Sequence, residues 1–127
     1  MSIRGIDHIN ISTDRLAETC AFFKTVLGLT DGFRPPFPFA GAWLYQGDQA
    51  VVHLIEKDRA MAPSSEASLD HFAFAIDDYE AMETRLKANG IEYRALQTPG
   101  TTIRQMFLRD PNGVNIELNW KGEKPAG

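Results

Sequence analysis

The chain has few of the features that mark secreted or membrane-spanning proteins. Its 127 residues contain one cysteine, Cys20, so an internal disulfide is excluded. No apolar run approaches the roughly 18 residues that a membrane-spanning helix needs, so no membrane partner is expected. The N-terminus lacks the basic, apolar and small-residue order of a signal peptide. These absences predict a cytoplasmic protein.

Positive charge is also limited. The chain has 13 Lys and Arg against 17 Asp and Glu, which gives a formal net charge of −4. The basic residues are scattered along the sequence, so no nucleic-acid partner is expected. The hydrophobic content of 43 % is ordinary for a globular protein. Length and composition together predict one compact domain over residues 1–127, or two very small modules that share a core.

The first half of the chain predicts a module over about 3–56. Residues 3–12 have the composition of a strand, and Asp14 has the side chain of a helix N-cap. Gly28 is expected to stop this helix, because glycine is favoured just past a helix end. Strands are expected within 29–56, with a turn at "YQGDQ" and an irregular loop at "FRPPFPFAG". Helical spacing predicts an apolar face of Leu16, Cys20, Phe23 and Leu27. Cys20 on this face is expected to be an inert core residue.

The second half predicts the same order of elements over about 69–120. A polar linker at 57–68 precedes it, and a frayed tail at 121–127 follows it. Asp77 and Glu80 have the spacing of a capping box at the start of a helix over about 78–89. Gly90 is expected to end this helix. The expected strands are 69–76, 91–96, 102–109 and 114–120, with a turn at "DPNG" before the last.

The two halves repeat one another. A shift of 63 residues places Asp7-His8 on Asp70-His71, and a shift of 64 places "WLYQGDQAVVHL" on "FLRDPNGVNIEL". Under the second shift His53 meets Glu117. The repeat predicts an α+β fold of two tandem β-α-β-β-β modules. It also places all three histidines and one carboxylate at equivalent positions.

Strand alternation places these residues on one kind of face. His8 shares its side of the strand with Asn10 and Ser12, whereas Ile9 and Ile11 point the other way. The strands that carry His71 and Glu117 likewise have one apolar face and one face of small or polar residues. Such a sheet would pack its apolar face on helices and curve the other around a cavity. Two imidazoles and a carboxylate in a cavity suit a divalent metal, namely Zn, Ni, Co, Mn or Fe.

Several of these segments resemble the vicinal oxygen chelate superfamily, the glyoxalase, bleomycin resistance protein and extradiol dioxygenase family. They are "DHINI", "FFKTVLGL", "DHFAFAI" and "FLRDPNGVNIEL", and the resemblance extends over roughly residues 4–120. It implies a curved mixed sheet around a metal-site cavity. It implies metal ligands at His8, His71 and Glu117, with His53 at the fourth position. Glyoxalase I usually has glutamate at that fourth position, so His53 is a departure that argues against strict lactoylglutathione chemistry.

The resemblance also bears on catalysis. Glu117 is the best candidate for a general base, and His53 is a catalytic candidate if it does not bind the metal. Fosfomycin-resistance proteins have a tyrosine and a lysine where this chain has Phe107 and Gln97. This difference argues against a fosfomycin-resistance function. The aromatic residues Trp43, Phe37 and Phe39 are candidates for contact with a substrate, with core packing or a dimer contact as alternatives. Arg34 and Arg104 are candidates for an anionic substrate, with surface roles as the alternative.

The function predicted from the resemblance is a divalent-metal-dependent lyase or isomerase that chelates vicinal oxygens of a small-molecule substrate. Two alternatives remain open at this point. One is an extradiol-type dioxygenase with a His-His-Glu iron site, and the other is a metal-free resistance protein that binds a small molecule. The resemblance further implies a homodimer with sites at the module interface. In that arrangement one chain gives His8 and His53, and its partner gives His71 and Glu117.

Overall fold

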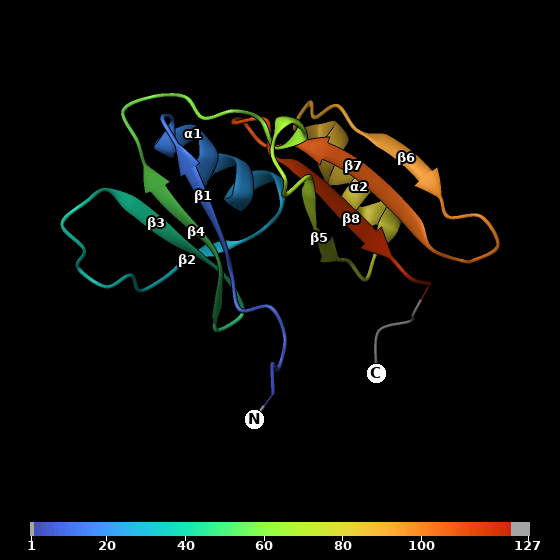
Figure 1. Cartoon of the computed structure of the whole chain (residues 1–127). Coiled ribbons are helices and arrows are strands. Elements are labelled where there is room, and N and C mark those ends of the chain that lie inside the picture. The colour runs from blue at the N-terminus through green and yellow to red at the C-terminus, as the bar shows by residue number, and fades with distance from the viewer. Residues whose placement is uncertain (1, 123–127) are drawn as a thin grey trace. The chain divides into compact units, whose positions relative to one another are not determined.

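The computed structural model describes residues 2–122, which fall into two compact units that are described separately (Figure 1). Unit 1 extends to Met61, and unit 2 begins at Ala62. Of the tail predicted at 121–127, residues 123–127 lie outside the described part of the chain. Each unit is a β-α-β-β-β module with one mixed four-stranded sheet. The predicted α+β fold of two tandem modules is therefore confirmed.

Unit 1 has the strand order β1-β4-β3-β2, in which β1 and β4 are parallel and the other pairs antiparallel. Helix α1 contacts β3 and β4 on one face of this sheet. The irregular loop predicted at 33–41 separates β2 from β3, and the predicted turn at Gly47 joins β3 to β4. The elements are β1 (Ile9–Thr13), α1 (Leu16–Ala21), the π-helix η1 (Phe22–Val26), β2 (Thr30–Asp31), β3 (Gly41–Gln46) and β4 (Gln49–Glu56).

Unit 2 repeats this topology with the strand order β5-β8-β7-β6. Strands β5 and β8 are parallel, and the other pairs are antiparallel. The "DPNG" turn before β8 is held by Asp110, whose carboxylate accepts hydrogen bonds from the backbone N–H groups of Asn112 and Val114. The elements are the short 3₁₀ helix η2 (Ser64–Glu66), β5 (His71–Ala75), α2 (Tyr79–Ala88), β6 (Arg94–Gln97), β7 (Arg104–Arg109) and β8 (Asn115–Trp120).

Strand register makes the internal repeat visible in three dimensions. Asn10 of β1 pairs with His53 of β4, and Ala73 of β5 pairs with Glu117 of β8. These two pairs are related by the same shifts of 63 and 64 that align the two halves of the sequence. Each sheet therefore carries its candidate ligands at matching places.

Each unit buries apolar residues on the face of its sheet that bears the helix. In unit 1 the buried apolar residues are Ile11, Phe22, Phe23, Val26, Leu29, Leu44, Val52 and Leu54. In unit 2 they are Tyr79, Leu86, Met106, Leu108, Ile116 and Leu118. Strand alternation then leaves the opposite face of each sheet for polar and half-buried side chains, as the sequence predicts.

The start of α1 differs from the prediction. Asp14 does not cap this helix, because the strand continues to Thr13, whose buried hydroxyl accepts from the backbone N–H of Arg15. Asp14 is exposed and contacts the Arg15 side chain instead. The buried helix face also differs, because η1 replaces the regular i→i+4 pattern. It consists of Thr19, Phe22, Phe23 and Val26, and Cys20 is only half-buried.

The start of α2 is also shifted. The N-cap is Asp78, one residue after the predicted Asp77, and its carboxylate accepts from the backbone N–H of Ala81 at 3.0 Å. The capping box of Asp77 and Glu80 is therefore wrong. Tyr79, in the first turn of the helix, is buried; the guanidinium of Arg104 lies over its ring, and Trp120 contacts it edge to face. Gly90 follows the helix with a positive φ of 66°, as expected for a residue just past a helix end.

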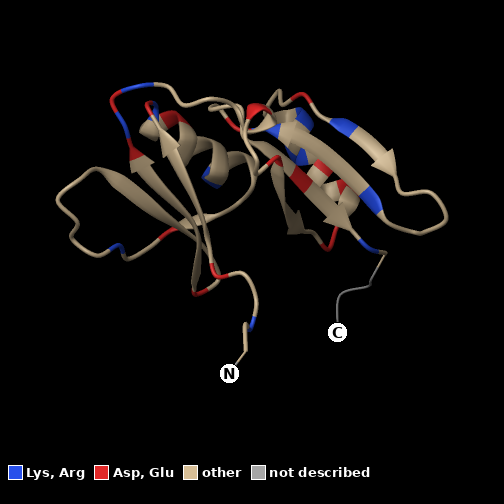
Figure 2. Cartoon of the chain, in the orientation of Figure 1, with Lys and Arg blue, Asp and Glu red and all other residues tan. Residues whose placement is uncertain are grey.

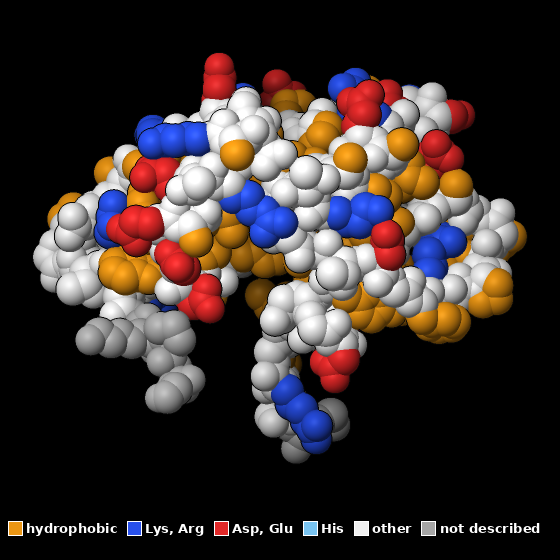
Figure 3. Space-filling view, turned by 180° about the vertical axis from the view of Figure 1, so that it is seen from behind, with side chains coloured by type: hydrophobic (Ala, Val, Ile, Leu, Met, Phe, Trp, Pro, Cys, Tyr) orange, Lys and Arg blue, Asp and Glu red, His pale blue; other side chains and the backbone are white. Residues whose placement is uncertain are grey.

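Acidic and basic residues alternate along the ribbon of each unit rather than being gathered by sign (Figure 2), and side chains of both signs are interspersed on the face drawn in Figure 3. In unit 2, basic residues mark the start of β6 and both ends of β7 (Figure 2). No helix in the described part of the chain combines the length and the apolar character needed to span a membrane.

The cap of α2 gives a direct test of its position. Asp78→Ala should lower the free energy of unfolding by about 1 kcal/mol, because the backbone N–H of Ala81 loses its side-chain acceptor. Asp77→Ala is the matched control, since Asp77 accepts no capping hydrogen bond. Urea denaturation followed by circular dichroism measures both. An equal loss for the two variants would contradict the assignment of Asp78 as the cap.

Candidate functional site

The four predicted ligands lie in two pairs, one in each unit. His8 and His53 belong to unit 1, and His71 and Glu117 belong to unit 2. Each pair joins the first and last strands of a module, which are parallel neighbours. Within the described residues no cluster of three or more His, Cys, Asp or Glu side chains is present. The structure thus forms each half of the predicted set, and the complete set of four remains a prediction.

In unit 1 the two imidazoles stack face to face. The ring centroids of His8 and His53 are 3.7 Å apart, and the ring planes differ by 8°. Trp43, which pairs with His53 across β3 and β4, stacks on the other side of His53 at 4.0 Å. His53 is therefore the middle member of a three-ring stack. Its neighbours fix the orientation of its ring.

The stack also favours the neutral form of His53. Burial lowers the pKa of His53 below its usual value, and the neighbouring His8 lowers it further. A hydrogen bond to the backbone of Ala50 and the charge of Asp7 oppose this effect only in part. Neutral imidazole is the form that binds a metal ion or accepts a proton. His53 is thus kept in the form that either predicted role requires.

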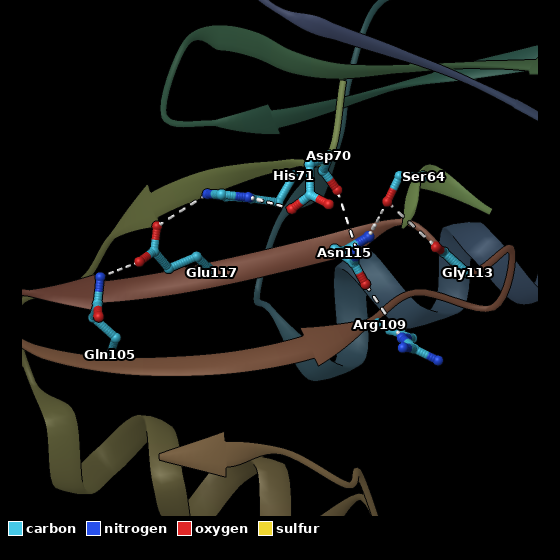
Figure 4. A network of polar contacts seen from close by, with 8 residues as sticks. All are labelled: Ser64, Asp70, His71, Gln105, Arg109, Gly113, Asn115 and Glu117. Carbon is cyan, nitrogen blue, oxygen red and sulfur yellow. Dashed lines mark hydrogen bonds and ion pairs between the residues drawn. The ribbon is translucent and has the colours of Figure 1, made fainter. Parts of the chain in front are cut away.

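In unit 2 the central group is the carboxylate of Glu117. The residue is 8 % exposed, although it lies on the polar face of the sheet. One carboxylate oxygen accepts a hydrogen bond from the side-chain amide of Gln105 on β7. The other oxygen lies 3.7 Å from Nε2 of His71 (Figure 4). Glu117 is therefore held between the amide and the imidazole.

A chain of polar contacts extends from this pair. Thr98 donates its hydroxyl to the amide oxygen of Gln105, so the orientation of that amide is itself fixed. At the other end, Asn115 donates to the backbone carbonyl of Asp70 and accepts from Nε of Arg109 (Figure 4). The network ties β7, β8 and the start of β5 together around the Glu117 carboxylate.

His8, just before the first strand of unit 1, and His71, at the start of the first strand of unit 2, each contact the aspartate that precedes them in the sequence. Nδ1 of His8 lies 2.7 Å from the carboxylate of Asp7, and Nδ1 of His71 lies 2.8 Å from that of Asp70. An ionised carboxylate can only accept, so Nδ1 is the donor in each pair. In the neutral ring this leaves the lone pair on Nε2 free. A carboxylate on the far nitrogen is the usual outer-shell partner of a metal-binding histidine.

These groups fit a divalent cation. Buried carboxylates are normally paired with a cation or bound to a metal ion. Among residues 2–122, Glu117 has no Lys or Arg partner, and its two side-chain neighbours are the amide of Gln105 and the imidazole of His71. Histidine nitrogen and carboxylate oxygen are also the donors that Zn, Ni, Co, Mn and Fe accept in proteins.

Three supporting residues were not assigned a role from the sequence. The "Asp-His" dipeptide occurs in both halves, and this repetition could have indicated a role for Asp7 and Asp70. Strand alternation did not, because it does not predict a contact between adjacent residues. Gln105 had no such signal. It reaches Glu117 because β7 and β8 are paired, a contact between residues 12 positions apart in the sequence.

The other candidates from the sequence have structural contacts. Arg34 lies over the rings of Phe37 and Phe39 and donates to the backbone carbonyl of Phe39. Arg104 stacks on Tyr79 at 3.7 Å. Phe37 also approaches Trp43, with ring centroids 6.3 Å apart. Phe37 and Phe39 are each 43 % exposed, so part of this aromatic group faces solvent.

Known proteins share this fold. A curated protein of Arabidopsis thaliana, "Glyoxylase I 4", is 29 % identical over 129 residues, which cover 93 % of this chain and 71 % of that protein. A glyoxylase/bleomycin resistance protein/dioxygenase domain from Frankia sp. EAN1pec has a TM-score of 0.79 and 18 % identity, covering 94 % of this chain and 99 % of that one. A lactoylglutathione lyase from Agrobacterium tumefaciens has a TM-score of 0.71 and 21 % identity, covering 94 % and 96 %.

The family is shown by a match that extends over both units. The sequence profile of the Glyoxalase/Bleomycin resistance protein/Dioxygenase superfamily matches residues 5–118. This span includes His8, His53, His71 and Glu117. The protein therefore belongs to the Glyoxalase/Bleomycin resistance protein/Dioxygenase superfamily.

Proposed function

We propose that this protein is a divalent-metal-dependent enzyme of the glyoxalase type, a lyase or isomerase that acts on a small substrate with adjacent oxygens. The observation that carries the proposal is the buried Glu117 carboxylate beside Nε2 of His71, with no Lys or Arg partner among the described residues. Membership of the superfamily and the similarity to a curated glyoxylase I protein support it.

The proposed metal ligands are His8, His71 and Glu117, with His53 as the fourth. Asp7 and Asp70 would hold the two first-strand imidazoles with Nε2 toward the metal. A divalent ion bound there would supply a Lewis acid that polarises substrate oxygens. In this proposal each module contributes two of the four ligands, because His8 and His53 belong to unit 1 and His71 and Glu117 to unit 2.

The chain's own groups would carry the proton transfer. In this proposal Glu117 accepts the proton from the carbon next to the polarised carbonyl, because it is the buried carboxylate on the polar face. Gln105, fixed by Thr98, holds one carboxylate oxygen and leaves the other directed toward His71. If the fourth metal position is not taken by His53, this ring is the second group able to accept or return a proton, because burial and His8 lower its pKa and favour the neutral form.

A second candidate function is metal-free binding of a planar small molecule. The stack of His8, His53 and Trp43 favours it, because planar rings in contact offer a face on which another ring system packs. Partly exposed Phe37 and Phe39 extend the aromatic surface. Metal binding separates the two candidates.

The metal proposal predicts about one divalent ion per chain in protein purified without an affinity tag. Glu117→Gln or His8→Ala should weaken binding at least about 100-fold, because each removes a ligand. Calorimetric titration with Zn²⁺, Ni²⁺, Mn²⁺ and Fe²⁺, together with elemental analysis, measures this. Glu56→Gln is the control, since it makes the same chemical change at an exposed strand end. If none of the four ions binds, the metalloenzyme proposal is wrong and metal-free binding is favoured.

The proposed reaction predicts exchange of a carbon-bound proton. An α-hydroxycarbonyl compound in deuterated water should exchange its α-proton in the presence of metal-loaded protein, as followed by NMR. Glu117→Gln should slow the exchange by about 10²-fold or more, because the general base is lost. His53→Asn should slow the exchange further if that ring takes part in the proton transfer. Consumption of O₂ with a catechol, without such exchange, would instead favour an extradiol-type dioxygenase.

We also infer a twofold homodimer in which each site combines His8 and His53 of one chain with His71 and Glu117 of its partner. Strands β1 and β5 each form an edge of their own sheet, and an unpaired edge favours further association. Twofold symmetry would then give two equivalent sites.

Subunit exchange tests this assignment. A mixture of His8→Ala and Glu117→Gln chains should recover metal binding in part, because each heterodimer would contain one intact site and one doubly altered site. The unmixed variants serve as controls. Lack of recovery, with heterodimer formation verified by mass spectrometry, would place all ligands of a site on one chain. A monomer that binds metal at micromolar concentration would contradict the homodimer.

A further inference from the structure

The polar face of the unit 2 sheet carries two arginines, Arg94 and Arg109. Neither was assigned a role from the sequence, and neither belongs to the proposed metal site. Residues that pair across a strand ladder point to the same face. One such row contains Arg109, Asn115 and His71, and the next contains Arg94, Phe107 and Glu117. Arg94 is therefore next to Phe107 across the strand pair, and Arg109 is next to it along β7, on the same face as the proposed ligands.

Both arginines line a cavity of about 860 Å³ in unit 2. Phe107, Asn115 and His71 line the same cavity, so it connects the arginines with one of the proposed ligands. Two strand spacings separate Arg94 from Glu117, and the same number separates Arg109 from His71. This is about 10 Å between backbones, a distance that long arginine side chains and a compact substrate together can bridge.

The contacts of Arg109 fix its position without using its charge. Its Nε donates to the side-chain oxygen of Asn115 at 3.2 Å, and Asn115 in turn donates to the backbone carbonyl of Asp70 (Figure 4). The backbone N–H of Asn115 donates to the hydroxyl of Ser64. The terminal nitrogens of Arg109 make no hydrogen bond or ion pair within residues 2–122, so they are available to a ligand.

Arg94 is also available. Its guanidinium lies over the ring of Phe107 at 5.1 Å. In the part of the chain that the structure describes, it has neither an ion-pair nor a hydrogen-bond partner. Glu92 and Asp70 line the cavity too, yet Asp70 accepts from His71, and no ion pair joins Glu92 to either arginine. Both planar forks are therefore unpaired beside a ring on which an apolar part of a ligand can pack.

We propose that Arg94 and Arg109 form an anion subsite that binds the carboxylate or phosphate of the substrate. Planar guanidinium groups bind both anions in a bidentate manner. The substrate would thus be a compact molecule with adjacent oxygens at its reacting end and an anionic group at its other end. The inference rests on the proposed function in taking His71 and Glu117 as the reacting end, and it adds the class of substrate.

The first test uses the metal-free full-length protein, so that it does not depend on metal binding. The probes are dihydroxyacetone, its phosphate ester and hydroxypyruvate, which are respectively neutral, phosphorylated and carboxylated. The two anions should bind at least about tenfold more tightly than the neutral compound, as measured by calorimetry. The Nε–Hε NMR signals of Arg94 and Arg109 should shift during the same titration. The tighter of the two anions identifies the anionic group that the subsite prefers.

Variants test the residues. Arg94→Gln and Arg109→Gln should each weaken binding of the anions about tenfold and leave the neutral compound unaffected. Arg85→Gln on α2 is the matched control, because it removes the same charge from the same unit outside the cavity. Equal affinity for charged and neutral probes, or equal loss in Arg85→Gln, would overturn the subsite. Because both arginines are exposed, the variants should keep the melting temperature of the parent protein.

The two proposals fail in different ways. Anion binding that depends on Arg94 and Arg109 in a protein that takes up no divalent ion would uphold the subsite and refute the metalloenzyme. Metal binding without preference for the anionic probes would refute the subsite alone. In metal-loaded protein the anionic compounds should also show the faster α-proton exchange, with the advantage lost in Arg94→Gln.

Discussion

The parallel pairing of first and last strands within each unit is the constraint on which the architecture depends. Strand β1 pairs with β4, and β5 pairs with β8. A parallel pair cannot be closed by a tight turn, so the chain needs a long connection, which in each unit consists of a helical segment and two further strands. The same pairing brings His8 to His53 and His71 to Glu117 across more than 40 residues of sequence. One element of topology therefore determines both the helix position and the composition of each half of the candidate site.

The two halves differ in physical character although they share a topology. Unit 1 holds two imidazoles in a stack with Trp43, and burial lowers the pKa of His53. Unit 2 holds a buried carboxylate, oriented by the amide of Gln105 and facing an imidazole. Neutral nitrogen donors and an anionic oxygen donor complement each other around a divalent cation. The repeat thus supplies equivalent positions, and the substitution of histidine by glutamate between them supplies the difference in chemistry.

The fold by itself leaves the reaction open. A lactoylglutathione lyase and a domain described as glyoxylase/bleomycin resistance protein/dioxygenase share it at about one-fifth identity. Different reactions on one fold arise from the side chains that line the site. For this chain the side chains on the polar faces include His53, the aromatic group around Trp43, and Arg94 and Arg109, which have no ion-pair partner among the described residues.

The sequence alone determined the order of elements, the repeat and the face on which each histidine lies, because alternation and turn residues act between near neighbours in the chain. The repeat aligned His8 with His71 and His53 with Glu117, and the resemblance to the superfamily grouped His8 with His53 and His71 with Glu117. The expected helix starts were each displaced: the hydroxyl of Thr13, not the carboxylate of Asp14, accepts from the backbone N–H of Arg15, and Asp78, not Asp77, caps α2. Only the tertiary structure placed Gln105 on Glu117 and brought Arg94 and Arg109 to one cavity, because these contacts depend on register between paired strands, which no short stretch of sequence encodes.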